Sequence, residues 1–196
     1  SEDGILFNKG KTEIIKYPVA KEGGSYTIPS SVTSIGENAF SYCKNLTSIT
    51  IPSSVTSIGE NAFCDCYNLT SVTIPSSVTS IGDFAFSRCY NLTSVIVDSE
   101  NKNYCSEDGI LFNKGKTEII KYPAAKEGGS YTIPSSVTRI GHYAFRYCKN
   151  LTSITIPSSV TRIGNFAFDH CQNLTIYCKS DSDAPIYAKE SRVTYQ

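Results

Sequence analysis

The feature that most constrains this sequence is an internal repeat with a step of 23 residues. The motif Ile-Pro-Ser-Ser-Val recurs with that step, and it begins at Ile28, Ile51, Ile74, Ile133 and Ile156. A longer period is superimposed, because residues 1–18 return unchanged at 106–123, which makes a duplication of 105 residues. Periods of 20–50 residues are typical of solenoid proteins, in which each unit packs only on its neighbours.

The pattern within one unit predicts a strand followed by tight turns. In Leu46–Ile51 the last apolar residues alternate with polar ones, which is the period of a strand, and Pro52 ends it. The apolar residues of Ala62–Cys66 have the spacing of a short inward helical turn. Burying one unit returns about 10–20 kcal/mol, whereas ordering it costs roughly 1–2 kcal/mol per residue. A single unit should therefore be unfolded, and only a stack should fold.

We accordingly predict a mainly β repeat solenoid in which residues 1–196 form one domain. The expected architecture is a right-handed superhelix with one continuous parallel sheet and short 3-10 or helical turns. Residues 179–196 leave the repeat and are expected to form a C-terminal cap, with a short helix at 186–190 and a final strand at 192–195. A cap of this kind covers the last hydrophobic face of a solenoid.

Two stretches interrupt the 23-residue step. The motif positions Val97 and Ile133 are 36 residues apart, so 98–130 is expected to form an irregular rung, as is its copy at 1–25. Within these rungs we expect the strands Ile119–Tyr122 and Ile14–Tyr17 to belong to the same main sheet. This interpretation predicts one unbroken sheet instead of two halves joined by a linker.

Charge and hydropathy exclude several classes of function. The 18 basic and 18 acidic residues cancel, which argues against a nucleic-acid partner. No run of 18 apolar residues occurs, which argues against insertion in a membrane. The polar start of the sequence lacks the features of a signal peptide, so we expect a mature fragment whose signal and anchor lie elsewhere.

No arrangement in the sequence predicts catalysis or a cofactor. Gly4–Thr12 approaches a phosphate-binding loop, but five residues separate its glycines where the motif needs four, so a hairpin turn at Asn8–Lys11 is favoured. His142 and His170 are the only histidines and fall at different repeat positions, so no Ser, His and Asp set stands out. We expect a protein that is not an enzyme.

The eight cysteines are interpreted mainly as parts of the repeat. Five share one repeat position and are expected to be buried structural thiols, although bridges between neighbours stay open: Cys43, Cys66, Cys89, Cys148 and Cys171. Cys64-Asp65-Cys66 weakly resembles a metal-ligand pair, but zinc sites usually need a second pair, so no metal is predicted. The Asn-Leu-Thr motif, formally a glycosylation site, recurs with the repeat, and its Asn is expected to fix a turn.

The pattern L-T-S-I-T-I-P-S-S-V-T-S-I-G-E-N-A-F-x-x-C-x-N, as in Leu46–Asn68, resembles the BspA-like, or Treponema-type, leucine-rich repeats. The Asp-Gly-Ile-Leu-Phe-Asn segment and the Ile-Tyr-Ala-Lys-Glu of the tail are similar to features of that family. The resemblance covers nearly the whole chain. It implies a surface or secreted protein of a bacterium or a parasitic protist, and several such proteins are linked to adhesion.

Departures from the repeat give the candidate contact residues. Arg139, Arg146 and Arg162 replace serines of the first half, and Tyr143 and Phe166 lie one rung apart. Tyr67 and Tyr90 form a second aromatic pair with the same spacing. Arginine with aromatic side chains is an interface composition, whereas drift on a solvated face is the alternative. The flat Ser and Thr stripes of the sheet are either a plain β surface or a contact surface.

We therefore predict a cell-surface or secreted protein-binding or adhesion module. Its partner would be a protein or a glycan on another cell or in the host matrix. The alternative is a structural spacer or stalk segment of a larger surface protein. The oligomeric state stays open, with a monomer expected.

Overall fold

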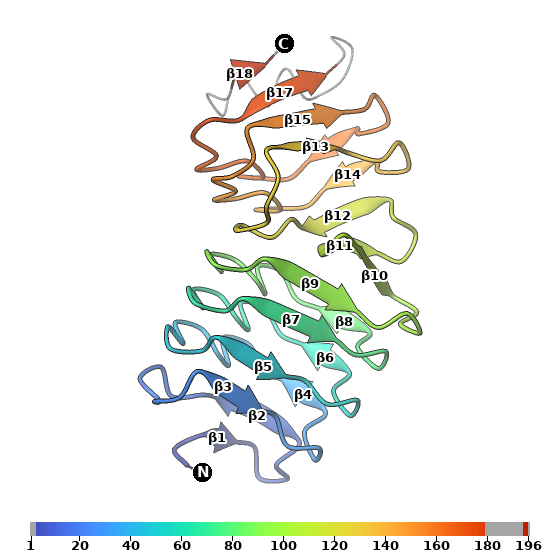
Figure 1. Cartoon of the computed structure of the whole chain (residues 1–196). Coiled ribbons are helices and arrows are strands. Elements are labelled where there is room, and N and C mark those ends of the chain that lie inside the picture. The colour runs from blue at the N-terminus through green and yellow to red at the C-terminus, as the bar shows by residue number, and fades with distance from the viewer. Residues whose placement is uncertain (1–2, 179–193, 196) are drawn as a thin grey trace.

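The chain forms a stack of rungs in a computed structural model that describes residues 3–178 and 194–195 (Figure 1). Each rung contributes a strand to a main sheet, a short strand to a second sheet and a set of tight turns. The predicted β solenoid is confirmed. Within the described ranges, no helix is long and apolar enough to cross a membrane.

The main sheet faces one side of the stack and consists of two parallel four-stranded pieces (Figure 1). The first piece contains β3 (Ser25–Thr27), β5 (Ser48–Thr50), β7 (Ser71–Ile74) and β9 (Ser94–Val97). The second piece contains β13 (Ser130–Thr132), β15 (Ser153–Ile156), β17 (Thr175–Cys178) and β18 (Thr194–Tyr195). Equivalent repeat positions lie opposite one another, so the Ser and Thr stripes run along the sheet as the sequence predicts.

A second pair of sheets lies across the core from the main sheet, and each sheet begins with antiparallel strands. One contains β1 (Leu6–Phe7), β2 (Glu13–Lys16), β4 (Ser34–Ile35), β6 (Ser57–Ile58) and β8 (Ser80–Ile81). The other contains β10 (Tyr104–Glu107), β11 (Ile110–Asn113), β12 (Glu118–Lys121), β14 (Arg139–Ile140) and β16 (Arg162–Ile163).

Turns between the second and main sheets form a third side, here named the turn ridge. It comprises residues 37–44, 60–67, 83–90, 142–149 and 165–172. Its amides alternate in direction: Phe63 N donates to Ala85 O of the next rung at 2.8 Å, and Cys66 N donates to Phe63 O within the rung at 3.2 Å. The predicted helical turn is therefore wrong as a helix, because left-handed residues turn every second amide outward.

The core between these three sides is built from stacked columns of identical side chains. Phe40, Phe63 and Phe86 stack with centroid distances of 5.2 and 5.6 Å. All eight cysteines are free, and the five of the repeat position are buried, which confirms their prediction as structural thiols. Each of these thiols donates to a carbonyl one rung away, as Cys66 Sγ does to Phe40 O at 3.1 Å.

The prediction of one continuous main sheet is wrong. β12 pairs with β14 in the second sheet, where Ile119 lies opposite Ile140, and β2 pairs with β4 in the same way. The main sheet stops at β9 and starts again at β13. The cause is the Asp108-Gly109 turn, whose φ angles of 51° and 74° fold β10 back on β11 as an antiparallel hairpin.

The apolar core divides at the same place. One cluster of buried side chains belongs to the first half and extends to Val97 and Leu111, and the other begins at Ile110. We name this region, between β8 and β12, the rung junction. It is visible in Figure 1 as the step between the green and yellow strands.

Two further expectations concern the ends of the chain. The hairpin turn at Asn8–Lys11 is confirmed, because Lys11 N donates to Asn8 O at 3.0 Å and β1 pairs antiparallel with β2. The predicted final strand is confirmed at Thr194–Tyr195, which pairs parallel with β17. The predicted helix at 186–190 lies outside the described residues.

Candidate functional site

The turn ridge carries two left-handed backbone positions in each rung. The first of them is occupied along the stack by Asn38, Asn61, Phe84, Tyr143 and Phe166, with φ between 52° and 59°. Asparagine tolerates this conformation, because its short polar side chain bonds locally. Bulky side chains pay about 1–3 kcal/mol for it. The aromatic residues therefore stand at positions where the fold itself favours the asparagines of the first rungs.

These aromatic residues form a first row along the ridge. The Phe84 and Tyr143 rings meet edge to face at a centroid distance of 5.0 Å, although 59 positions separate them in the sequence. Tyr143 then stacks on Phe166 at 5.3 Å, as the rung spacing predicts. Phe166 is 56 % exposed, so burial returns only part of its strain. The row crosses the rung junction and presents apolar surface to solvent.

A second aromatic row runs parallel to the first. Tyr67 stacks on Tyr90 at 4.9 Å, which confirms the predicted pair. Tyr90 meets Tyr147 at 4.7 Å, and Tyr147 meets His170 at 4.4 Å. Burial, and then a hydrogen bond with Tyr147, raise the pKa of Tyr90 to about 12, so its hydroxyl stays protonated near neutral pH. This row therefore offers both apolar ring faces and hydroxyl groups.

Arg146 joins the two rows. Its guanidinium carbon lies 4.9 Å from the ring centroids of both Tyr143 and Tyr147, within the range of a cation–π interaction. Arg146 Nε also lies 2.8 Å from Asp169 Oδ2, and that carboxylate oxygen lies 2.9 Å from His170 Nδ1. Because Arg146 is held from both sides and only 14 % exposed, it fixes the rings in place.

Arg139 and Arg162 lie off the ridge. They are neighbours on β14 and β16, opposite each other in register, as the rung spacing predicts. Arg139 Nε is 3.3 Å from Glu118 Oε1, whereas Arg162 is exposed. The structure thus divides the predicted contact residues: five lie on the ridge, and these two lie on the adjacent sheet.

Sequence reasoning missed three members of the aromatic rows: Phe84, Tyr147 and His170. A signal for Phe84 was present, because it lies 23 residues after Asn61 and so shares the repeat position of Tyr143. The 36-residue interval after Val97 hid that relation. The second row had no such signal, because Tyr90 and Tyr147 occupy different repeat positions and meet only across the junction.

The ridge has the chemistry of a contact surface. In the part of the chain that the structure describes, no group of three or more His, Cys, Asp or Glu side chains is placed to hold a metal ion. What the ridge offers is rigid aromatic rings, hydroxyl groups and an immobilised arginine, which are the side chains that dominate binding energy at protein interfaces.

A stack of 23-residue rungs with an L-x-x-I-x-I strand is a leucine-rich-repeat solenoid. Residues 22–127 and 126–186 match the model of the BspA type leucine rich repeat region, with six copies. The chain belongs to this family. No curated protein matches it.

Solved structures of bacterial proteins share the fold. A leucine rich cell surface protein from Faecalibacterium prausnitzii A2-165 is 38 % identical with a TM-score of 0.73, over 79 % of this chain and 41 % of that one. The pneumococcal vaccine antigen PcpA is 33 % identical with a TM-score of 0.75, over 78 % and 38 %. A leucine-rich repeat protein from Eubacterium ventriosum ATCC 27560 is 29 % identical with a TM-score of 0.53, over 87 % and 66 %. The chain spans about two fifths of the first two relatives.

Proposed function

We propose that this chain is a non-enzymatic protein-binding module of adhesion type, carried on a bacterial cell surface or secreted. The turn ridge is its binding face, and the partner is a protein of another cell or of the host matrix. Membership of the BspA type family supports the surface role, as does the similarity to a cell surface protein and to a vaccine antigen.

The observation that carries the proposal is the aromatic occupation of left-handed positions. Phe84, Tyr143 and Phe166 stand where Asn38 and Asn61 stand in the first rungs. Stability alone favours asparagine there, because it avoids the strain of a bulky side chain in this conformation. Retaining three adjacent aromatic rings at a cost in stability is the pattern expected of a surface that has to contact something.

The flatness of the ridge and its immobilised arginine favour a protein partner. Arg146 and its aromatic neighbours resemble the central cluster of an interface, and Arg162 with Tyr67 would lie toward the rim. Rigid rings lose little conformational entropy on binding, which raises affinity for a given contact area. Such a surface suits a folded or extended protein segment laid along several rungs.

The test uses variants that restore the repeat's own residues. Phe84→Asn, Tyr143→Asn and Phe166→Asn together install the asparagine of the first rungs, so the fold should be kept. Ile96→Thr is the matched control, since Ile96 is 50 % exposed in the Thr stripe of the main sheet. Binding would be measured by biolayer interferometry against purified matrix and host-surface proteins, and against a glycan array.

A protein partner that loses affinity with the triple variant and keeps it with Ile96→Thr supports the proposal. Removing three contact residues should weaken binding by a factor of about a hundred or more, since each central residue contributes roughly 1–2 kcal/mol. Binding that survives the triple variant would exclude the ridge, and glycan binding alone would exclude a protein partner. Absence of any partner would favour the spacer role.

A further inference from the structure

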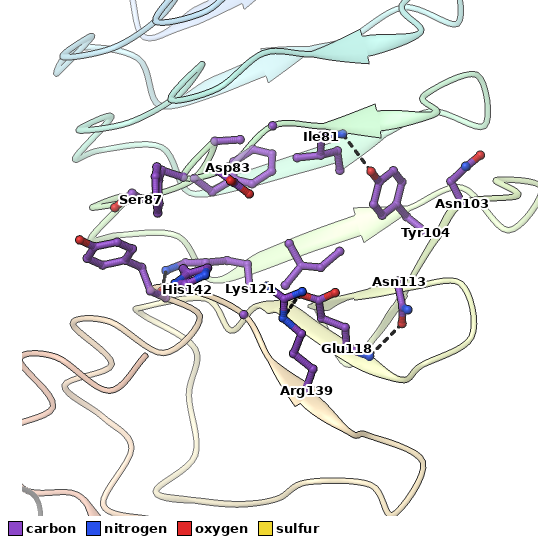
Figure 2. Close-up of a pocket in the computed structure, with 17 residues that line it drawn as sticks. Ile81, Asp83, Ser87, Asn103, Tyr104, Asn113, Glu118, Lys121, Arg139 and His142 are labelled. Carbon is purple, nitrogen blue, oxygen red and sulfur yellow. Dashed lines mark hydrogen bonds and ion pairs between the residues drawn. The ribbon is translucent and has the colours of Figure 1, made fainter. Parts of the chain in front are cut away.

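The rung junction contains a cavity of about 410 Å³. Its walls come from the end of β8 and the adjoining ridge, from β10 and β11, and from β12 and β14. Figure 2 shows Asp83 on one wall, Glu118 and Arg139 opposite, Lys121 and His142 toward the ridge, and Tyr104 toward the hairpin. This volume is within the range of about 300–1,000 Å³ that small-molecule sites occupy.

The break in the ladder leaves backbone donors facing this cavity. In the other rungs the equivalent amides donate to the next rung, as Asn61 N does to Asp83 O at 3.0 Å and Phe63 N does to Ala85 O at 2.8 Å. Phe84 N and Phe86 N have the same orientation, because Phe84 keeps the left-handed φ of 59°. Neither finds an acceptor among the described residues, and both residues line the cavity.

A buried ammonium group lines the same cavity. Lys121 is only 5 % exposed, and its one hydrogen bond is a long one of 3.3 Å from Nζ to Tyr143 O. Lys121 forms no ion pair with any residue that the structure describes. A buried charge is costly unless it is paired. The lysine therefore lacks the anionic partner that its burial calls for.

The N-terminal copy shows how the fold satisfies this lysine elsewhere. Lys16 occupies the same place in the duplication, and its Nζ donates to Asn38 O at 2.7 Å and to Ser41 Oγ at 2.9 Å. In the second copy Arg146 replaces that serine and turns to Asp169. The second copy thus gave up a protein partner for Lys121 next to the cavity.

The remaining lining defines the rest of a ligand. Arg139 is already neutralised by Glu118, which leaves Lys121 as the unpaired cation, so a monoanion matches better than a doubly charged phosphate. His142 Nδ1 accepts from Asn165 N at 2.9 Å, so its ring donates through Nε2. The Asp83 carboxylate and the Tyr104 hydroxyl can pair with hydroxyl groups of a ligand.

We propose that the rung junction binds a small carboxylate that also carries hydroxyl groups, a sugar acid being the fitting class. The carboxylate accepts from Lys121 Nζ and from the amides of Phe84 and Phe86, and the hydroxyl groups face Asp83 and Tyr104. This site is separate from the ridge surface, although Phe84 and Tyr143 belong to both. Its failure or success leaves the ridge proposal standing on its own test.

The experiment is a titration of the ¹⁵N-labelled chain, followed by NMR. The probes are glucuronate, galacturonate and N-acetylneuraminate, with glucose and galactose as neutral counterparts and inorganic phosphate as a competing oxyanion. At least one sugar acid should shift the Phe84 and Phe86 amides in a saturable way, with its neutral counterpart much weaker. No saturable shift from any sugar acid overturns the proposal, and so does phosphate acting alone.

A matched pair of variants tests the lysine. Lys121→Met removes the ammonium group, and Lys16→Met makes the same change at the duplicated position away from the cavity. Affinity for the sugar acid should fall about ten- to a hundredfold in Lys121→Met, the size of a charged hydrogen bond, and stay unchanged in Lys16→Met. Equal affinity in both variants would refute the assigned role. The wild-type amide shifts decide the matter even if a variant fails to fold.

Discussion

Replacing Gly59 with alanine should force two rungs of the solenoid apart. A Cβ atom at this position would lie 2.7 Å from Gly36 C, 2.7 Å from Glu37 N and 2.9 Å from Gly36 O. All three are backbone atoms of the preceding rung, so no side chain can rotate away. Ordinary contact begins at 3.4 Å, and the rungs must therefore separate by about 0.7 Å (3.4 − 2.7) at this point.

That separation breaks specific bonds. Gly59 N donates to Ile35 O at 2.8 Å, and Asn38 N donates to Glu60 O at 2.9 Å, and both bonds would lengthen beyond a useful distance. Two hydrogen bonds at about 1 kcal/mol each, with an overpacking cost of about 1–3 kcal/mol, give a loss of about 3–5 kcal/mol. Gly59→Ala should therefore remove a large share of the free energy of unfolding.

Urea unfolding followed by circular dichroism would measure this loss. Gly115→Ala is the control, because the nearest atom to its new Cβ is Thr117 Cγ2 at 3.8 Å and its φ is not left-handed. That substitution should be neutral or stabilise by about 0.4–1 kcal/mol, because it restricts the unfolded chain. A loss below about 1 kcal/mol for Gly59→Ala would show that the rungs have slack, contrary to the packing argument.

Two further predictions concern buried titratable groups. Burial lowers the pKa of Lys121, so its charge destabilises the fold at neutral pH, and this destabilisation fades as the pH rises from the folded pKa toward the ordinary value near 10.5. Lys121→Met should therefore have a higher melting temperature than Lys16→Met at pH 7, by about 2–4 °C per kcal/mol, with the gap narrowing at pH 10; an equal gap at both pH values would contradict the reasoning. Burial raises the pKa of Cys43 to about 11 and of Cys89 to about 12, so these thiols should resist alkylation at pH 8 until the chain unfolds. Rapid native-state labelling of either, read by peptide mass spectrometry, would disprove their burial.

Much of the architecture could be predicted because the repeat makes it nearly one-dimensional. A side chain at one position meets its own equivalent 23 residues later, so the stacking of Tyr143 on Phe166 and the pairing of Arg139 with Arg162 followed from counting alone. The thiol column followed in the same way. The counting fails where the step changes from 23 to 36, since register there depends on how the inserted residues fold.

At that interruption a local signal was outweighed by a misleading analogy. Tyr122-Pro123 resembles the strand end Ile51-Pro52, which suggested a main-sheet strand. In the structure Tyr122 instead stacks on Phe145 at 5.0 Å, and Ile119 pairs with Ile140. The aromatic ring extends the phenylalanine column, and this burial sets the strand's place.

The sequence by itself determined the solenoid, its rung length, its columns and its family, because identical units stacked in register leave one arrangement that buries every apolar stripe. Only the tertiary structure decided what happens at the rung junction. There the hairpin of β10 and β11 interrupts both sheets, and residues without a common period meet: Phe84 beside Tyr143, Tyr90 beside Tyr147, and Lys121 beside unmatched amides. Contacts between non-equivalent positions have no periodic trace in the sequence, so both proposed binding sites became visible only once the chain was folded.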